Sequence, residues 1–236
     1  MNRLSGWIGV VLCLFLLGPG CAPRRTVTDA ENQGRIVEAQ ALIERAAASV
    51  TAMRADSAAF DQSLDQAVAV LVFPRYFRAG YFLSASGARG VLLARDQAGF
   101  WSAPAFYSLG RVGGGIQIGV EYGALVYVIL DASLLESMAQ DRWQLDAQAS
   151  VVAITTDERN QVSGLTDQDQ ALLFTDMAGL YAGVSLEGAY VDFLDQITGA
   201  YHKDSSLTPT DIVLGGRGRR DGVEALVEVL LAPPGS

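Results

Sequence analysis

The sequence predicts an α+β fold in which a strongly bent antiparallel sheet, approaching a barrel, is flanked by helices from the N- and C-terminal parts. Three observations predict it. Residues 36–66 carry apolar side chains at helical spacing, residues 68–154 form short apolar runs separated by glycine, and helix signals return after Thr208. The connections between the runs are short, which favours antiparallel neighbours over helical crossovers. We therefore expect one sheet between two groups of helices.

The first twenty residues have the layout of a secretory signal. Arg3 precedes an uninterrupted apolar stretch from Trp7 to Leu17, which is followed by Gly18-Pro19-Gly20. The stretch is about half as long as the roughly 20 residues that a membrane-spanning helix needs, and Gly-Pro-Gly ends a helix. We interpret residues 1–20 as the cleaved signal peptide of an exported chain, with a retained transmembrane anchor as the alternative.

Cys21 directly follows the small residues that end the predicted signal. This arrangement resembles the lipobox of bacterial lipoproteins, in which the cysteine receives a diacylglyceryl group and becomes the mature N-terminus. The lipobox prefers leucine three positions before the cysteine, whereas this chain has Gly18 there and Leu17 one position earlier. The resemblance implies lipid attachment at Cys21, and the alternative is simple cleavage beside an incidental cysteine.

Ala22, which follows the cysteine, is similar to the residue found in lipoproteins destined for the outer membrane. The resemblance implies a chain that is lipid-anchored to the bacterial cell envelope, on the periplasmic face of the outer membrane. Retention in the inner membrane is the alternative.

The composition of the mature chain excludes several classes of protein. Removal of residues 1–20 leaves 16 basic and 26 acidic side chains, a formal charge of −10, which argues against nucleic-acid binding through bulk electrostatics. Cys21 remains as the only cysteine, so the mature chain has neither a disulfide framework nor a cysteine zinc site. Its length and hydrophobic content suit one core. We predict a single domain at residues 35–232, joined to Cys21 by a flexible leash at 21–34.

The first predicted element is an amphipathic helix, because apolar residues recur at spacings of three and four between Ile36 and Met53. Its apolar face is narrow and rich in alanine, so we expect it to pack on the domain rather than enter lipid. A short helix is predicted from Ser57 to Gln66. Strands are then predicted at 68–73, 80–84, 90–95, 100–107, 115–121 and 125–130.

The second half of the chain mixes both kinds of element. Asp131 is the expected cap of a helix that ends near Asp141, and strands are predicted at 145–154, 171–177 and 180–186. Thr208 and Pro209 have the residue types of a helix cap and first turn. The predicted last segment, 223–231, is either a helix or an edge strand.

A glycine-rich run at 110–115 has the composition of a phosphate-binding loop, since glycine lets backbone amides approach an anion. No Gly-Lys-Ser/Thr follows, and both flanks are predicted strands rather than a strand and a helix. We interpret the run as a close crossing of antiparallel strands.

The remaining polar residues form no recognisable catalytic set, so we predict no enzymatic activity, no cofactor and no metal site. Residues 183–188 resemble a nucleophile elbow, but the second glycine stands three residues after Ser185 instead of two. The single histidine, His202, lies on a predicted helix and is interpreted as a solvated surface side chain. Two acidic pairs lie in predicted loops, where solvation explains them and weak calcium binding is the alternative: Asp157/Glu158 and Asp167/Asp169.

The segment 75–111 stands out by its charge, because its five arginines accompany a single acid, Asp96, in an otherwise acidic chain. Aromatic residues are interleaved with them. Arginine beside interfacial aromatics suits an anionic lipid headgroup at an apolar boundary. The alternative is that the aromatics belong to the core and the arginines are solvated or paired. The candidate headgroup contacts are Arg75, Arg78, Arg89, Arg95, Arg111, Tyr76 and Phe77.

Two ordered blocks of this sequence resemble the signatures of the SYLF domain, also called the Ysc84 or actin-regulator domain. The resemblance spans roughly residues 40–215. The first block comprises Val70-Leu71-Val72-Phe73-Pro74, Ala79-Gly80, Gly90-Val91-Leu92, Trp101-Ser102-Ala103-Pro104-Ala105-Phe106, Ser108-Leu109-Gly110 and Gly115-Ile116-Gln117-Ile118-Gly119. The second runs from Gly179 to Gly188.

This resemblance implies a lipid-binding module without known catalysis. Eukaryotic members bind phosphoinositides, yeast-like members also bind actin, and bacterial members are often envelope lipoproteins. The present chain is acidic and carries no SH3 or FYVE module, so we transfer neither phosphoinositide specificity nor actin binding. The expected partner is membrane lipid, contacted through acylated Cys21 and the domain surface. The alternative function is a structural or interaction protein of the envelope that binds protein partners.

Overall fold

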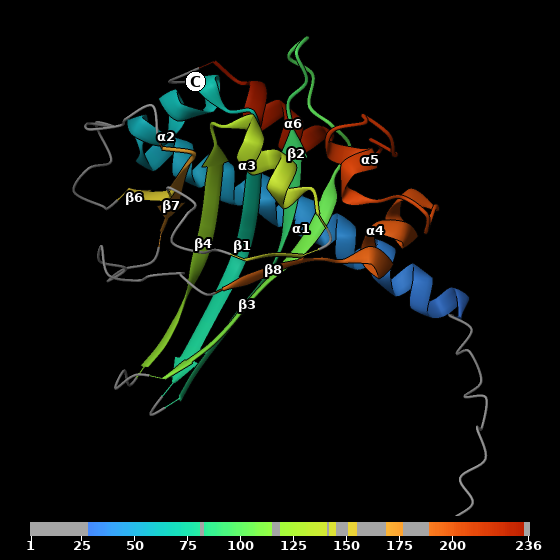
Figure 1. The fold of residues 1–236 in the computed structure, drawn as a ribbon, viewed down its shortest axis with the longest axis horizontal. Helices are drawn as coiled ribbons and strands as arrows, with labels where there is room; N and C mark the ends of the chain where they lie inside the picture. Colours follow the sequence, from blue (N-terminus) through green and yellow to red (C-terminus); the bar gives the residue numbers. More distant parts are fainter. Residues whose placement is uncertain are drawn as a thin grey trace, which may run out of the picture.

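The computed structural model describes residues 28–80, 83–114, 119–140, 142–144, 151–154, 169–176 and 189–233. These residues form a curved sheet with helices on both faces (Figure 1). The helices are α1 (Asp29–Asp56), α2 (Ala58–Ser63), followed by a short helical turn η1 (Leu64–Gln66), α3 (Ala132–Met138), α4 (Asp195–His202), α5 (Pro209–Val213) and α6 (Glu224–Leu231). The strands are β1 (Ala69–Gly80), β2 (Leu83–Ala94), β3 (Ala105–Gly114), β4 (Gly119–Ile129), β5 (Arg142–Gln144), β6 (Val151–Ile154), β7 (Ala171–Thr175) and β8 (Tyr190–Phe193).

Helix α1 begins at Asp29, inside the segment 21–34 that the sequence predicted as a leash, so the leash boundary was wrong. A capping box explains the earlier start. The Thr28 side chain accepts a hydrogen bond from the Glu31 backbone amide, and the Glu31 carboxylate accepts one from the amide of Thr28. The predicted packing of the helix on the domain is confirmed, since its apolar side buries seven residues: Ala39, Leu42, Ile43, Ala46, Ala47, Val50 and Met53.

The described strands form one sheet in the order β5-β8-β3-β2-β1-β4-β7-β6. The predicted α+β class with a strongly bent sheet is confirmed (Figure 1). One pair departs from the antiparallel prediction, because β6 and β7 run parallel. The segment between Ile154 and Ala171 is long enough for the crossover that a parallel pair needs. β5 and β6 are the two edges, and no pairing between them closes a barrel within the described residues.

Glycine did not separate strands in the way that the sequence analysis predicted. The described residues of the runs at 68–73, 80–84 and 90–95 lie in or directly beside two long strands, β1 and β2. Those of the runs at 115–121 and 125–130 lie in or directly beside β4. These strands lie in the middle of the sheet and pair with a neighbour on both sides. Their ladders of hydrogen bonds therefore hold glycine in extended backbone despite its weak strand propensity.

Two layers of helices cover one end of the sheet. On one face α1, α2, α4 and α6 bury side chains such as Val70, Val72 and Phe106. On the other face α3 and α5 bury their neighbours, such as Leu71 and Phe73. Figure 1 shows α1 and α6 behind the strands and α3 in front of them. The uninterrupted apolar run at 70–73 is thus explained by burial on both faces.

Beyond the helices, strands β1 to β4 continue as a helix-free projection, which Figure 1 shows toward the lower left. Each of the four strands has ten or more residues, and ten residues extend for about 33 Å. The helices therefore cover only part of the length of these strands.

A bulge in β1 marks the passage from the covered end to the projection. Val72 pairs with Val91 and Phe77 with Gly87, so β1 has one more residue than β2 between these pairs. The same extra residue appears against β4. Pro74 lies in this irregular stretch, where its missing backbone donor does not interrupt a regular ladder. The bulge reverses which face each later residue of β1 occupies.

The predicted helix signals of the second half are confirmed. Asp131 caps α3 through the Ser133 amide, and Thr208 caps α5 with Pro209 in its first turn. The segment 223–231, for which helix and edge strand were both open, is the helix α6. Two strands that the sequence analysis did not predict, β5 and β8, add an edge to the sheet beside β3.

A buried ion pair joins the end of α1 to α2, and its arginine also binds the end of the C-terminal helix α6. The Arg54 guanidinium lies 2.5 Å from the carboxylate of Asp61, and the two side chains are 10% and 8% exposed. Arg54 also donates to the carbonyl of Val229 and, at 2.8 Å, to that of Ala232, at the end of α6. One arginine thereby satisfies carbonyls that the end of a helix leaves without partners.

Several predictions fall on residues outside the described ranges: the signal peptide, Cys21, the strand at 180–186, the near-elbow at Ser185 and the acids Asp157, Glu158 and Asp167. Among the helices that are described, none has the length and apolar composition needed to cross a membrane.

Gly90 supplies a test of the bulge. A Cβ at this position would lie 2.4 Å from the Val72 carbonyl oxygen and 2.5 Å from the Phe73 ring, so we expect Gly90→Ala to lower the free energy of unfolding by about 1–3 kcal/mol. Gly110→Ala is the control, because its Cβ meets no atom within 4 Å. Urea denaturation measures both. Equal stability of the two variants would contradict the close packing at Gly90.

Candidate functional site

The candidate residues of the segment 75–111 divide among several environments. Arg75 lies in the bulge of β1 and is exposed, with no hydrogen bond or ion pair to any described residue. Phe77, two residues later, is 49% exposed. Tyr76 between them is buried in the core on the α3 side, so it cannot contact a headgroup as the sequence analysis proposed. Alternation along the strand puts the two neighbouring rings on opposite faces.

Arg78 and Arg111 belong to the projection, and only their backbone is described. Arg78 pairs with Ser86 of β2, and Ser86 pairs with Arg111 of β3. The two arginines therefore stand in one row across the sheet, two strands apart. On its other side Arg78 pairs with Glu121 of β4. The register thus brings together two arginines that are far apart in the sequence.

Arg89 is held by the long helix. Its guanidinium forms an ion pair with Glu38 of α1, although the arginine side chain remains 54% exposed. An exposed pair of this kind contributes little to stability and is screened by salt. Arg89 therefore contacts a carboxylate of its own chain before it can contact a ligand.

Arg95 is part of the fold rather than of an exposed surface. Its guanidinium carbon lies 4.7 Å from the ring centroid of buried Trp101, and its Nη1 donates to the Asp65 carbonyl at 3.2 Å. This stacking holds the two ends of the β2–β3 connection together. The role proposed for Arg95 as a headgroup contact does not fit this geometry, because its charge is directed to internal partners.

The sequence analysis missed two aromatic residues beside Phe77. Tyr122 of β4 pairs with Phe77 and is 75% exposed. Across the sheet, Phe77 pairs with Gly87, Gly87 with Gly110, and Gly110 with Tyr190 of β8, which is 39% exposed. We call these five residues the aromatic–glycine row. Tyr122 lay outside the segment chosen by charge, and β8 was not predicted, so no local signal placed Tyr190 beside it.

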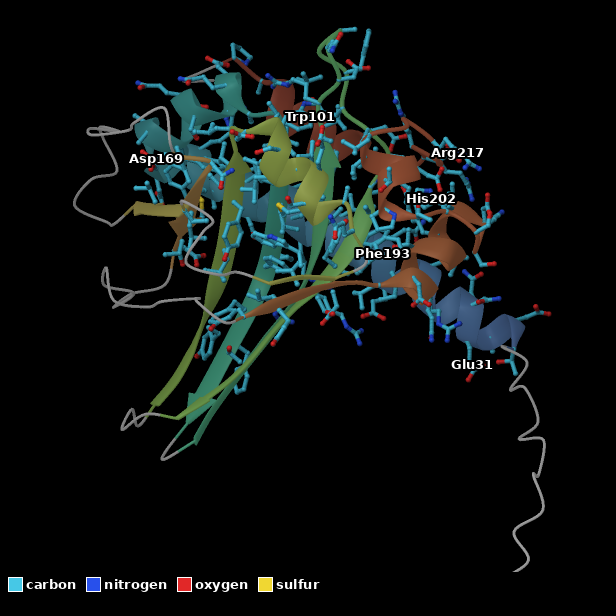
Figure 2. The ribbon with its side chains drawn as sticks, viewed as in Figure 1. Glu31, Trp101, Asp169, Phe193, His202 and Arg217 are labelled. Carbon is cyan, nitrogen blue, oxygen red and sulfur yellow. The ribbon has the colours of Figure 1, made fainter. Side chains whose placement is uncertain are left out.

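His202 is buried, so its interpretation as a solvated surface residue was wrong. The side chain is 4% exposed at the end of α4, next to the segment that contains Arg217 (Figure 2). Nδ1 accepts a hydrogen bond from the Arg219 amide at 2.9 Å, which leaves Nε2 to donate to the Pro104 carbonyl at 2.9 Å. The helix pattern gave no sign of this role, because both partners come from distant segments.

The surroundings of His202 favour the neutral ring. Burial lowers the pKa of His202, opposed by its hydrogen bond to Pro104, and Arg219 lowers it further. Gly218, at φ +107°, packs over the ring, since a Cβ there would lie 2.9 Å from an imidazole carbon. Burial also raises the pKa of the neighbouring Tyr201 to about 12. His202 therefore fastens the C-terminal loop to the sheet and is not placed as a catalytic base.

A polar hollow of about 530 Å³ lies between α1 and α4. Arg35 and Lys203 line it together with Asp195 and Asp204, so both signs of charge are present. Arg35 donates to Gln196 at 2.7 Å across the hollow. Within the described residues, no group of three or more histidine, cysteine or acidic side chains converges as a metal site would require.

Comparison with known proteins gives a consistent result. A family model described as Ysc84, Las17-binding protein actin regulator, matches residues 110–232. SH3 domain-containing YSC84-like protein 1 of Homo sapiens is 30% identical over 155 residues, which are 65% of this chain and 45% of that protein. Its Xenopus laevis counterpart is 28% identical over 155 residues, 65% of this chain and 46% of that protein.

Protein YSC84 of Saccharomyces cerevisiae is 29% identical over 118 residues, 48% of this chain and 25% of that protein. The matched part of the chain thus spans less than half the length of each of these relatives.

The burial of His202 predicts a pH dependence of stability. In the unfolded chain the imidazole takes up a proton as the pH falls through about 6.5, whereas the folded protein takes it up at lower pH. The free energy of unfolding should therefore decrease from about pH 6.5 downward to the folded pKa, by at most about 1.4 kcal/mol per pH unit. Because this is the only histidine, NMR of its ring reports the folded pKa directly. The control is His202→Gln, in which the free energy of unfolding should depend less steeply on pH below about 6.5. An unchanged pH dependence in this variant would contradict the assignment to His202.

Proposed function

Because this chain belongs to the Ysc84 family, we propose that it is a module without catalytic activity that binds the surface of a lipid membrane. The observation that carries the proposal is the positive charge of the projection in an acidic chain. Arg75 is exposed there, and Arg78 and Arg111 stand in one row of the sheet. Cationic side chains near an anionic leaflet each contribute about 1 kcal/mol to membrane binding.

We propose that the chain lacks catalytic activity because the side chain best suited to acid–base catalysis serves the fold instead. His202 is occupied by two hydrogen bonds within the fold. Among the described residues, no three histidine, cysteine or acidic side chains converge as they would in a metal-dependent active site. The family description names a binding protein and regulator, which is consistent with this proposal.

We further propose that the chain is exported and anchored to the bacterial cell envelope through acylated Cys21, on the periplasmic face of the outer membrane. The support is the apolar leader and the small residues before the cysteine. Several acyl chains anchor a protein more firmly than one. Under this proposal the affinity of the domain itself need only be modest, because the anchor already holds it at the membrane.

A second candidate function is a scaffold that binds a protein partner. It is favoured by the family description, which names Las17 as the bound protein of the family. The two functions differ in what the exposed arginines contact, and charge reversal distinguishes them.

Vesicle flotation of the chain without residues 1–20 and with Cys21→Ser tests the membrane proposal without the acyl anchor or the apolar leader. We expect it to float with vesicles that contain phosphatidylglycerol and not with pure phosphatidylcholine. Raising the salt from 0.05 to about 0.5 M should release it, because salt screens exposed charges. Failure to float with either kind of vesicle would reject membrane binding by the domain.

Charge reversal at the bulge identifies the surface. We expect Arg75→Glu to weaken binding to phosphatidylglycerol vesicles by about thirtyfold, since it changes the local charge by two units. Arg220→Glu makes the same change at an exposed position of the C-terminal loop and serves as the matched control. If Arg75→Glu leaves vesicle binding unchanged but abolishes co-purification of a protein partner, the scaffold function is favoured instead.

A further inference from the structure

The aromatic–glycine row is a surface of aromatic rings and glycine that is partly exposed in the described structure. Phe77, Tyr122 and Tyr190 are 49%, 75% and 39% exposed, although each belongs to a paired strand. The register puts all three on the face of the sheet that α1 covers further along. Phe77 and Tyr122 lie beyond the bulge in β1, on the side away from the helix-packed Val72 and Val126. Exposed aromatics gathered in one row are typical of a binding surface.

The two glycines of the row have no internal explanation in the described structure. A Cβ at Gly110 would meet no atom within 4 Å, and one at Gly87 would make only an ordinary contact of 3.6 Å with the Leu109 carbonyl oxygen. Neither glycine has a positive φ. A strand-interior glycine without a steric reason often marks a place where a ligand approaches the backbone. Here two such glycines are register partners and form a bare floor between Phe77 and Tyr190.

The polarity of this face changes in a fixed order along the strands. The row nearer the helices contains Arg89, Ser108 and Asp192, which are register partners. The aromatic–glycine row follows. Two residues further out, where only the backbone is described, the register continues with the aliphatic residues Val120, Ala79, Ala85 and Val112.

Charged, then aromatic, then aliphatic is the order met on passing from the headgroups into the acyl chains of a leaflet. A protein partner would require no such gradient. The exposed Arg75 adds positive charge at the bulge, and alternation puts the row of Arg78 and Arg111 on the opposite face of the same strands. This positive charge complements anionic headgroups rather than a second copy of this chain with the same charge.

We propose that the projection enters an anionic membrane leaflet through this face, with lipid acyl chains resting on Gly87 and Gly110 between Phe77 and Tyr190. The inference rests on the proposed function and specifies the surface that carries it. In this orientation the helices stay outside the leaflet, and the tyrosine hydroxyls lie near the headgroups. The arginines bring the protein to the surface, and the aromatic rings hold it there.

Partitioning into vesicles tests the row against a matched aromatic. In the chain without residues 1–20 and with Cys21→Ser, we expect Phe77→Ser/Tyr122→Ser to lower partitioning into phosphatidylglycerol vesicles at least about tenfold. Phe100→Ser should leave it unchanged, because Phe100 is 65% exposed at the helix-covered end of the sheet. Circular dichroism checks that each variant is folded. Should the double variant not fold, Gly110→Asp replaces it, because a Cβ at this position meets no atom within 4 Å and the carboxylate adds a charge to the floor. The same loss is expected.

A fluorescent probe reports insertion directly. An environment-sensitive dye on Tyr122→Cys should shift to the blue with vesicles and be quenched by nitroxides on the acyl chains, whereas the dye on Phe100→Cys should do neither. Vesicle binding of the unsubstituted domain with no effect of the row variants and no quenching overturns this inference but leaves the proposed function intact. No vesicle binding at all overturns both. A substitution in the aromatic–glycine row that changes the oligomeric state but not vesicle binding would show that this face mediates self-association. That result also overturns the inference.

Discussion

Helix α1 lies across the sheet through a stripe of small and β-branched side chains, and this contact determines which parts of the protein are buried. Alanines at positions 39, 46 and 47 let the helix backbone approach the strands closely, while Ile43 and Val50 fill the space beside them. With α3 and α5 on the opposite face, the sheet is buried on both sides at this end. The strands are longer than the cover that the helices provide, so their other ends remain free of helices. The exposed surface considered for function is the direct result of this mismatch in length.

The bulge in β1 determines which residues of the exposed part of the strand lie on each face of the sheet. One extra residue between Val72 and Phe77 reverses the alternation of the strand, so that Tyr76 joins the core on the α3 side and Phe77 the opposite face. Gly90 gives the bulged strand room on β2. With a regular strand, Phe77 and Tyr122 would stand on opposite faces, and the aromatic–glycine row would not exist.

The arginines of the segment 75–111 have different roles in the structure. Arg95 stacks on Trp101 and Arg89 pairs with Glu38, whereas Arg75 projects from the bulge. The candidate surface is therefore smaller than the local excess of positive charge suggested, because Arg89 and Arg95 contact other parts of the fold. For His202 the local sequence was misleading in the opposite direction. Its charged neighbours suggested a surface residue, but the side chain is buried and its hydrogen bonds fasten a loop to the sheet.

The sequence by itself determined the helix caps at Asp131 and Thr208, the apolar stripe of α1 and the α+β class, because these depend on neighbours within a turn or on a repeating pattern. It also contained the signatures of the family. Only the tertiary structure decided the course of the long strands through glycine, the position of the bulge and the meeting of Phe77, Tyr122 and Tyr190. Strand pairing links residues that are distant in the chain, and a shift of one residue exchanges the two faces. No local pattern specifies that register, so the candidate surface emerged only when the strands were paired.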